Sequence, residues 1–267
     1  MSRSGYYRWL QRADEPDRDY ADYRLVKELF DKGRGKYGWR TIKMKLESTK
    51  NVLMNHKKIS RLMKKFHLVA KIRRLNPYKA ILKKTPEHRT FENALNRDFA
   101  QTTPRKVFVT DITYLPFNRR MAYLSTIKDV ATREIVGWDA SLRLELDIVF
   151  NTIARMKDNI PPAVLKKALI HSDHGGHYTN PRYIAAIKQL HMVQSMSRKG
   201  NCIDNAPMES FFGHFKDDVD YKTYQTFAEL KAAIAAYIEY YNNERQQWNL
   251  KKMTPAQYRN HLLATPK

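Results

Sequence analysis

The sequence is poor in cysteine and contains no long hydrophobic run. Its one cysteine, Cys202, can form neither an internal disulfide nor a cysteine-rich zinc site. No segment approaches the roughly 20 apolar residues that a membrane-spanning helix needs, and the first residues lack the apolar centre of a secretory signal. These absences argue against a disulfide-rich secreted domain and a membrane protein, so we expect a cytoplasmic protein.

Acidic residues are scarce relative to basic ones. The 27 acidic residues face 49 lysines and arginines, which leaves a net charge of +22 at pH 7. A surface this basic attracts polyanions. Nucleic acid is the first candidate partner and an anionic membrane surface is the second, and charge alone does not separate them. The length of 267 residues and the hydrophobic fraction of 42% predict one substantial globular core with a smaller module.

Residues 20–70 are predicted to form a small all-α module of three short helices, because apolar residues recur there at helical spacing. Asn55 is placed to cap the last helix. The polar face of that helix is basic and carries Lys57, Lys58, Arg61, Lys64 and Lys65. This pattern is typical of a helix-turn-helix that contacts DNA, although a packing module with a solvated basic face remains an alternative. Residues 1–19 are expected to form a basic tail, and residues 71–97 a basic linker.

From residue 105 onward, short strands alternate with helices. Expected strands cover 107–115, 121–127, 134–138, 168–172 and 192–194. Expected helices cover 146–156, 181–190 and about 204–219, followed by 227–241 and another from residue 254. The order predicts an α/β fold with a mixed five-stranded sheet flanked by helices, compatible with the ribonuclease-H-like fold. Its core is expected over 98–221, with C-terminal helices in 222–267 completing it.

Three acidic residues occupy places where function is a better explanation than local structure. Asp111 interrupts a strand, where carboxylates are disfavoured. Asp173 follows the predicted central strand, and Glu209 lies in the first turn of a helix begun by Pro207. Magnesium prefers carboxylate oxygens, and two ions about 4 Å apart can clamp the attacking and leaving oxygens of a phosphoryl transfer. We therefore expect Asp111, Asp173 and Glu209 to be catalytic and to hold two magnesium ions.

Other residues are assigned supporting roles around these acids. Lys216 projects from nearly the same side of its helix as Glu209, and Arg198 and Lys199 precede that helix; all three are candidate DNA contacts. His171 and Asn205 are expected to orient the carboxylates without touching the ions. A rival hypothesis is a zinc hydrolase, because histidines and an aspartate crowd one segment, namely His171, Asp173, His174 and His177.

Three segments of the sequence resemble the three acidic blocks of DDE transposases. They are Thr110–Thr113, His171–Thr179 and Ser197–Phe211. Thirty-five residues separate Asp173 from Glu209, the interval typical of that family, and Lys216 matches its basic residue seven positions beyond the glutamate. Further segments resemble the family's C-terminal signature and its helix-turn-helix module: Tyr241–Arg245, Met253–Arg259, Tyr37–Arg40 and Ser60–Met63. The most similar group is the second-frame (OrfB) product of bacterial insertion sequences of the third named family; retroviral integrases are distant relatives.

The resemblance implies an integrase-type catalytic core that depends on magnesium, for which manganese substitutes. It implies strand cleavage and strand transfer at the terminal inverted repeats of an element, with target DNA as the second substrate. It also implies an upstream OrfA-type partner with a helix-turn-helix and a coiled coil, separate or fused, and a homo-oligomer on DNA in the nucleoid. The alternative is a DNA-binding regulator or an inactive transposase remnant, which would bind DNA without metal-dependent cleavage.

Overall fold

The computed structural model describes residues 3–4, 6–7, 17–71, 91–198 and 202–264. The chain divides into two compact units, Met1–Arg73 and Arg74–Lys267. Each unit has its own hydrophobic core. Among the described helices, none has both the length and the apolar character to span a membrane.

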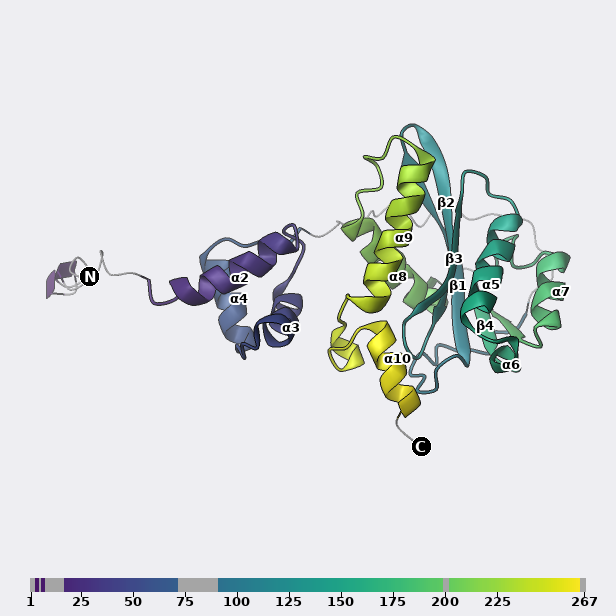
Figure 1. Cartoon of the computed structure of the whole chain (residues 1–267), viewed down its shortest axis with the longest axis horizontal. Coiled ribbons are helices and arrows are strands. Elements are labelled where there is room, and N and C mark those ends of the chain that lie inside the picture. The colour runs from purple at the N-terminus through teal and green to yellow at the C-terminus, as the bar shows by residue number, and fades with distance from the viewer. Residues whose placement is uncertain (1–2, 5, 8–16, 72–90, 199–201, 265–267) are drawn as a thin grey trace. The chain divides into compact units, whose positions relative to one another are not determined.

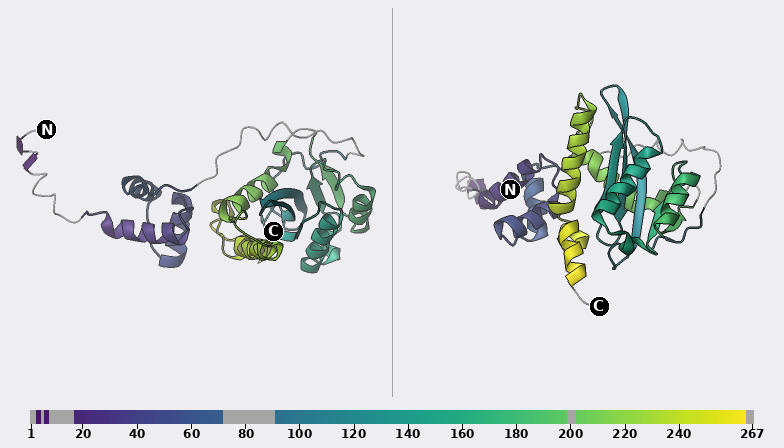
Figure 2. Two further views of the ribbon diagram at one scale, coloured as in Figure 1. Left: turned by 90° about the horizontal axis from the view of Figure 1, so that it is seen from above. Right: turned by 45° about the vertical axis from the view of Figure 1, so that its right-hand side comes forward.

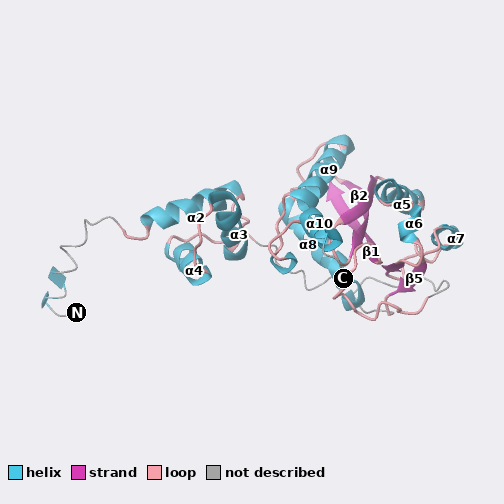
Figure 3. Cartoon of the chain, turned by 60° about the horizontal axis from the view of Figure 1, so that its bottom comes forward, coloured by secondary structure: helices cyan, strands magenta, loops and turns pink. Residues whose placement is uncertain are grey.

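The first unit is the expected helical module. It contains α2 (Tyr20–Lys32), α3 (Trp39–Lys50) and α4 (His56–Lys65) (Figure 3). Asn55 caps α4, because its side chain accepts a hydrogen bond of 2.9 Å from the backbone N–H of Lys57. Apolar side chains from all three helices meet in one core, which includes Val26, Leu29, Ile42, Leu46, Ile59 and Leu62. The predicted helical spacing therefore identified the faces that pack together.

The second unit is built on a five-stranded mixed sheet with the order β3-β2-β1-β4-β5 (Figure 1). The first three strands form an antiparallel meander, and β4 and β5 add to it in parallel. The strands are β1 (Val107–Phe117), β2 (Arg120–Asp129), β3 (Ile135–Ser141), β4 (Leu169–Ser172) and β5 (Val193–Met196). This is the mixed sheet expected of a ribonuclease-H-like core.

Helices cover both faces of the sheet (Figure 1, Figure 2). The helices and short 3-10 turns are α5 (Asp147–Asn159), α6 (Pro162–Leu165), α7 (Pro181–Gln189), η2 (Cys202–Asn205), α8 (Ala206–Asp218), α9 (Phe227–Asn243), η3 (Trp248–Leu250) and α10 (Pro255–Ala264). Side chains alternate along β1, so that Val109 and Leu115 pack toward α8 and α9 while Phe108 packs toward α5 and α7. Position 111 shares the parity of Val109 and therefore lies on the α8 face.

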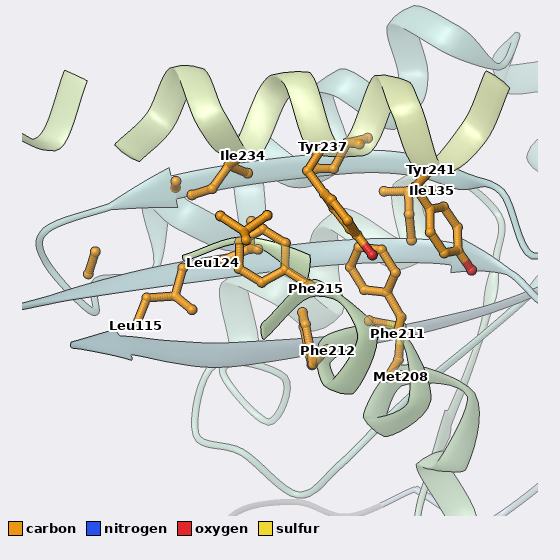
Figure 4. Packing of buried hydrophobic residues seen from close by; sticks show 14 of the residues in the cluster. Leu115, Leu124, Ile135, Met208, Phe211, Phe212, Phe215, Ile234, Tyr237 and Tyr241 are labelled. Carbon is orange, nitrogen blue, oxygen red and sulfur yellow. The ribbon is translucent and has the colours of Figure 1, made fainter. Parts of the chain in front are cut away.

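Aromatic rings fill the layer between the sheet, α8 and α9 (Figure 4). Phe211 meets Tyr241 edge to face at 4.9 Å between ring centroids, and Phe215 meets Tyr237 at 5.2 Å in the same manner. Such pairs add roughly 0.5–1.5 kcal/mol beyond the burial of their area. The phenylalanines of α8 are thus core residues, which fixes the helix against the sheet and leaves its other side for function.

Two parts of this unit differ from expectation. The linker was expected to extend to residue 97. Residues 91–97 instead belong to the second unit, and Leu95 is buried in the core of that unit. A short helix, α6, also follows α5 where only a break was expected. Residues 72–90 of the expected linker and most of the expected tail lie outside the described residues.

Gly137 on β3 provides a test of the packing between the sheet and α5. A Cβ at this position would lie 2.5 Å from the backbone oxygen of Thr152. We predict that Gly137→Ala destabilises the protein by about 1–3 kcal/mol through overpacking, which lowers the melting temperature by roughly 2–4 °C for each kcal/mol. Gly176→Ala is the matched control, since a Cβ there meets nothing within 4 Å. Equal melting temperatures for the two variants would contradict this account.

Candidate active site

Asp111 lies on β1, and Asp173 directly follows β4, the parallel neighbour of β1. The last paired positions of β1 and β4 are Val109 and His171, so continuing the register by two residues sets position 173 level with position 111. Parallel neighbours are about 4.8 Å apart, and both residues have the parity of the α8 face. The strand pairing thus brings Asp111 and Asp173 to the same end of this strand pair.

Backbone groups orient each of these carboxylates. Asp111 Oδ1 accepts from the N–H of Ile112 at 2.8 Å, and Asp173 Oδ1 accepts from the N–H of Gly175 at 2.8 Å. A Cβ at position 175 would approach Asp173 Oδ1 to 2.8 Å, so glycine is what allows this tight turn after β4. Both side chains are partly exposed, as a site that admits a substrate requires.

The hydroxyl of Tyr178 lies beside Thr110, the residue before Asp111. It is 3.4 Å from Thr110 Oγ1, and Tyr178 is buried in the core on α7's side of the sheet. Burial raises the pKa of Tyr178 well above its usual value, and the negative charges of Asp111 and Asp173 raise it further. The phenol therefore stays protonated and neutral.

Glu209 lies in the first turn of α8, whose start is tied to the sheet beside Asp111. Asn205 Nδ2 donates to the backbone oxygen of Thr110 at 3.3 Å, and Lys128 Nζ on β2 donates to the backbone oxygen of Pro207 at 3.0 Å. The Glu209 side chain is exposed. Among the described residues, however, no three His, Cys, Asp or Glu side chains are close enough together to hold one ion in common. The fold thus brings Asp111 and Asp173 to the same end of β1 and β4 and ties the start of the helix that carries Glu209 to β1 and β2.

A fourth acid, Asp204, was not identified from the sequence. Its side chain is completely buried just before α8, between the guanidinium groups of Arg97 and Arg198. Hydrogen bonds from Arg198 are the largest cause of a pKa held far below the usual range of an aspartate. The only sequence signal was its place beside Asn205 in the third acidic segment, because Arg97 is 107 residues away.

The histidines of the 171–177 segment all have hydrogen-bond partners other than a metal. His171 is fully buried, with Nδ1 2.9 Å from Ser195 Oγ and Nε2 3.2 Å from Ser197 Oγ. His174 Nε2 contacts the backbone oxygen of Ser197, and His177 Nε2 lies 3.2 Å from that of Leu144. Burial lowers the pKa of His171 to about 4, so its ring is neutral at neutral pH. The contacts of His171 and His174 link β4 and the residues after it to β5 and Ser197, and that of His177 reaches the segment before α5; none of them favours a zinc site.

The predicted DNA contacts near α8 have different surroundings. Arg198 directs Nε and Nη2 to Asp204, each at 3.0 Å, so much of its charge is engaged within the protein. Lys216 lies on α8 seven residues after Glu209 and is partly exposed. Lys199 lies outside the described residues.

The basic face of α4 is divided into two parts. Three of its cations pair with acids at the start of the unit: Lys58 with Asp22, Arg61 with Asp19, and Lys65 with both Asp17 and Asp19. Lys57 and Lys64 have no acidic partner in the described part of the unit. They line a pocket of about 440 Å³ together with Trp39, His56, Ser60 and Arg61. The sequence pattern identified all five cations but not this division.

Family models match both units of the chain. A model described as an HTH-like domain matches residues 17–75. Two models described as an integrase core domain match residues 101–202 and 209–263. The solved HTLV-2 integrase catalytic core in complex with magnesium is 16% identical, with a TM-score of 0.45, and the match covers 58% of this chain and 97% of that one.

Relatives encoded by bacterial insertion sequences match almost the whole chain. InsK of element IS150 in Escherichia coli (strain K12), named as a transposase, is 36% identical over 97% of this chain and 90% of its own length. The transposase of element IS904 in Lactococcus lactis is 34% identical over 87% of this chain and 91% of its own length. The HTH-like match corresponds to the first structural unit, and both integrase-core matches lie in the second. The chain therefore belongs to the transposases of bacterial insertion sequences, which carry an integrase core domain.

Proposed function

We propose that this protein cleaves DNA at the ends of an insertion sequence and joins those ends to target DNA, with Asp111, Asp173 and Glu209 as the catalytic residues. The observation that supports the proposal is the parallel pairing of β1 with β4, which ends two residues before both Asp111 and Asp173, together with the hydrogen bond that ties the start of the Glu209 helix to Thr110. The integrase core domain makes the chain a polynucleotidyl transferase, and the three acids supply its chemistry.

The donor set fits magnesium. Carboxylate oxygens are the ligands that magnesium prefers. When only a few carboxylates bind the ion, its other coordination positions stay open for substrate phosphates. Asn205 lies beside β1, and its buried Oδ1 has no hydrogen-bond partner among the described residues. A water molecule bound to a magnesium ion would supply the donor that this oxygen needs. Bound magnesium, or manganese in its place, would activate the attacking hydroxyl and stabilise charge on the leaving oxygen.

The residues around the acids prepare the site for this chemistry. Asp111 and Asp173 are held by backbone N–H groups, so little reorientation is needed when substrate arrives. The neutral phenol of Tyr178 and the neutral ring of His171 support the site without adding a positive charge that would compete for the carboxylates. Glu209 lies where the helix dipole of α8 favours a negative charge.

DNA is the partner that the basic charge and the HTH-like unit favour. Contacts to phosphates contribute affinity that depends on salt, and Lys57, Lys64 and Lys216 are the cations proposed to provide them, because Arg198 is paired with Asp204. Terminal inverted repeats and target DNA are the proposed duplexes. An OrfA-type helix-turn-helix and coiled-coil protein, separate or fused, and a second copy of this chain on DNA are the proposed protein partners, and the nucleoid is the proposed location.

Substitution of each acid tests the catalytic assignment. We predict that Asp111→Asn, Asp173→Asn and Glu209→Gln each reduce magnesium-dependent strand cleavage by at least about 100-fold, because even residues that only orient a metal ligand contribute 10–100-fold. Labelled element ends report cleavage, and circular dichroism reports folding. Glu239→Gln, an exposed acid on α9, is the matched control and should retain activity. A folded Asp173→Asn protein with normal cleavage would refute the assignment.

The division of the basic face of α4 predicts unequal effects on DNA binding. Lys64→Ala should lower the slope of log affinity against log salt by about 0.9, the value for one phosphate contact. Lys58→Ala should change the slope less, because Asp22 already offsets its charge. Fluorescence anisotropy with duplex DNA at several salt concentrations measures both slopes. Equal slopes for the two variants would show that the ion pairs of α4 open when DNA binds.

A further inference from the structure

Asp204 connects three separate parts of the catalytic unit through one buried carboxylate. Oδ1 accepts from Arg97 Nε at 2.6 Å and Arg198 Nη2 at 3.0 Å. Oδ2 accepts from Asn93 Nδ2 at 3.0 Å and from the backbone N and Nε of Arg198 at 2.9 and 3.0 Å. The side chain is fully buried, and both oxygens are occupied. Asp204 is thus saturated with donors and is not available to a metal ion.

The residues after Asp204 lead directly to Glu209. Asn205 bonds to the backbone oxygen of Thr110, which precedes Asp111. The backbone oxygen of Pro207 then accepts from Lys128 on β2. Glu209 follows in the first turn of α8, five residues after Asp204. The start of α8 is therefore held at three points, and the Asp204 cluster contributes the most hydrogen bonds, each of them charge-assisted.

The segment before β1 forms the other half of this cluster. Besides Asn93 and Arg97, the backbone N–H of Leu95 donates to Ser195 Oγ at 3.2 Å, and the backbone oxygen of Glu92 accepts from Met196 at 3.3 Å. Ser195 in turn contacts His171 on β4. Residues 92–97 thus connect the start of α8 to β5 directly and, through Ser195, to β4, which ends just before Asp173.

We propose that Asp204 is a positioning residue for strand cleavage and transfer, which fixes Glu209 relative to Asp111 and Asp173 through Arg97 and Arg198. The inference rests on the proposed function of the three acids. A displacement of about 1 Å in a reacting group can cost 100-fold in rate. Loss of the cluster loosens the start of α8, which is then held by Asn205 and Lys128, while the backbone pairing of β1 with β4 remains. Glu209 is therefore the acid that is expected to shift most.

The test uses the full-length protein with Arg97→Ala and Asp204→Asn. The Arg97 side chain is 38% exposed, so its removal leaves little cavity, and this variant decides the question if Asp204→Asn does not fold. We expect kcat for strand cleavage to fall about 10–100-fold, as for other residues that orient metal ligands, with KM for end DNA within threefold of normal. Binding of manganese, followed by electron paramagnetic resonance without turnover, should weaken by a similar factor.

Arg259→Ala is the matched control. Arg259 pairs with Glu134, another buried acid, but on β3's side of the unit and away from α8. Its removal should lower the melting temperature yet leave kcat and manganese affinity within threefold of normal. Unchanged kcat and manganese affinity in Arg97→Ala, or losses no larger than in Arg259→Ala, would overturn the inference. Retained cleavage by Glu209→Gln would instead overturn the assignment of the three acids.

Discussion

The parallel pairing of β1 with β4 is the constraint on which the catalytic unit depends. It joins the meander of the first three strands to the two short strands that follow α5 and α6. It also brings residues 111 and 173, which are far apart in the sequence, to the same end of the strand pair. Because side chains alternate along a strand, a slip of one residue in this register would turn one of the two carboxylates to the opposite face.

Some charged groups in this protein hold its segments together and others are exposed to a substrate, and burial and hydrogen-bond partners distinguish the two classes. Asp204 is buried and surrounded by guanidinium groups, so it holds segments together. Asp111 and Asp173 are partly exposed, and Glu209 is exposed, so they are accessible to a substrate. The same division occurs on α4, where Lys58 is paired with an acid and Lys64 lines a pocket with Trp39. Because several lysines and arginines are paired with acids, fewer cations are available to DNA than the net charge suggests.

Local patterns in the sequence predicted most of the fold. Alternation identified β1, helical spacing identified α8 and α9, and the cap expected at Asn55 marks a real helix start. These features depend on neighbours in the chain, which is why a single sequence contains them. Asp204 and the role of residues 91–97 were missed because their contacts join residues about 100 apart. The three acids were found by their unusual positions and by family resemblance, whereas their spatial relation required the sheet register.

The most direct test of the account is a crystal structure of the protein with element-end DNA and manganese, in which anomalous scattering locates the ions. The account predicts manganese peaks in contact with Asp111, Asp173 and Glu209, at the edge where β4 ends and α8 begins. Peaks bound elsewhere, or a Glu209 side chain that makes no contact with an ion while DNA is bound, would contradict it.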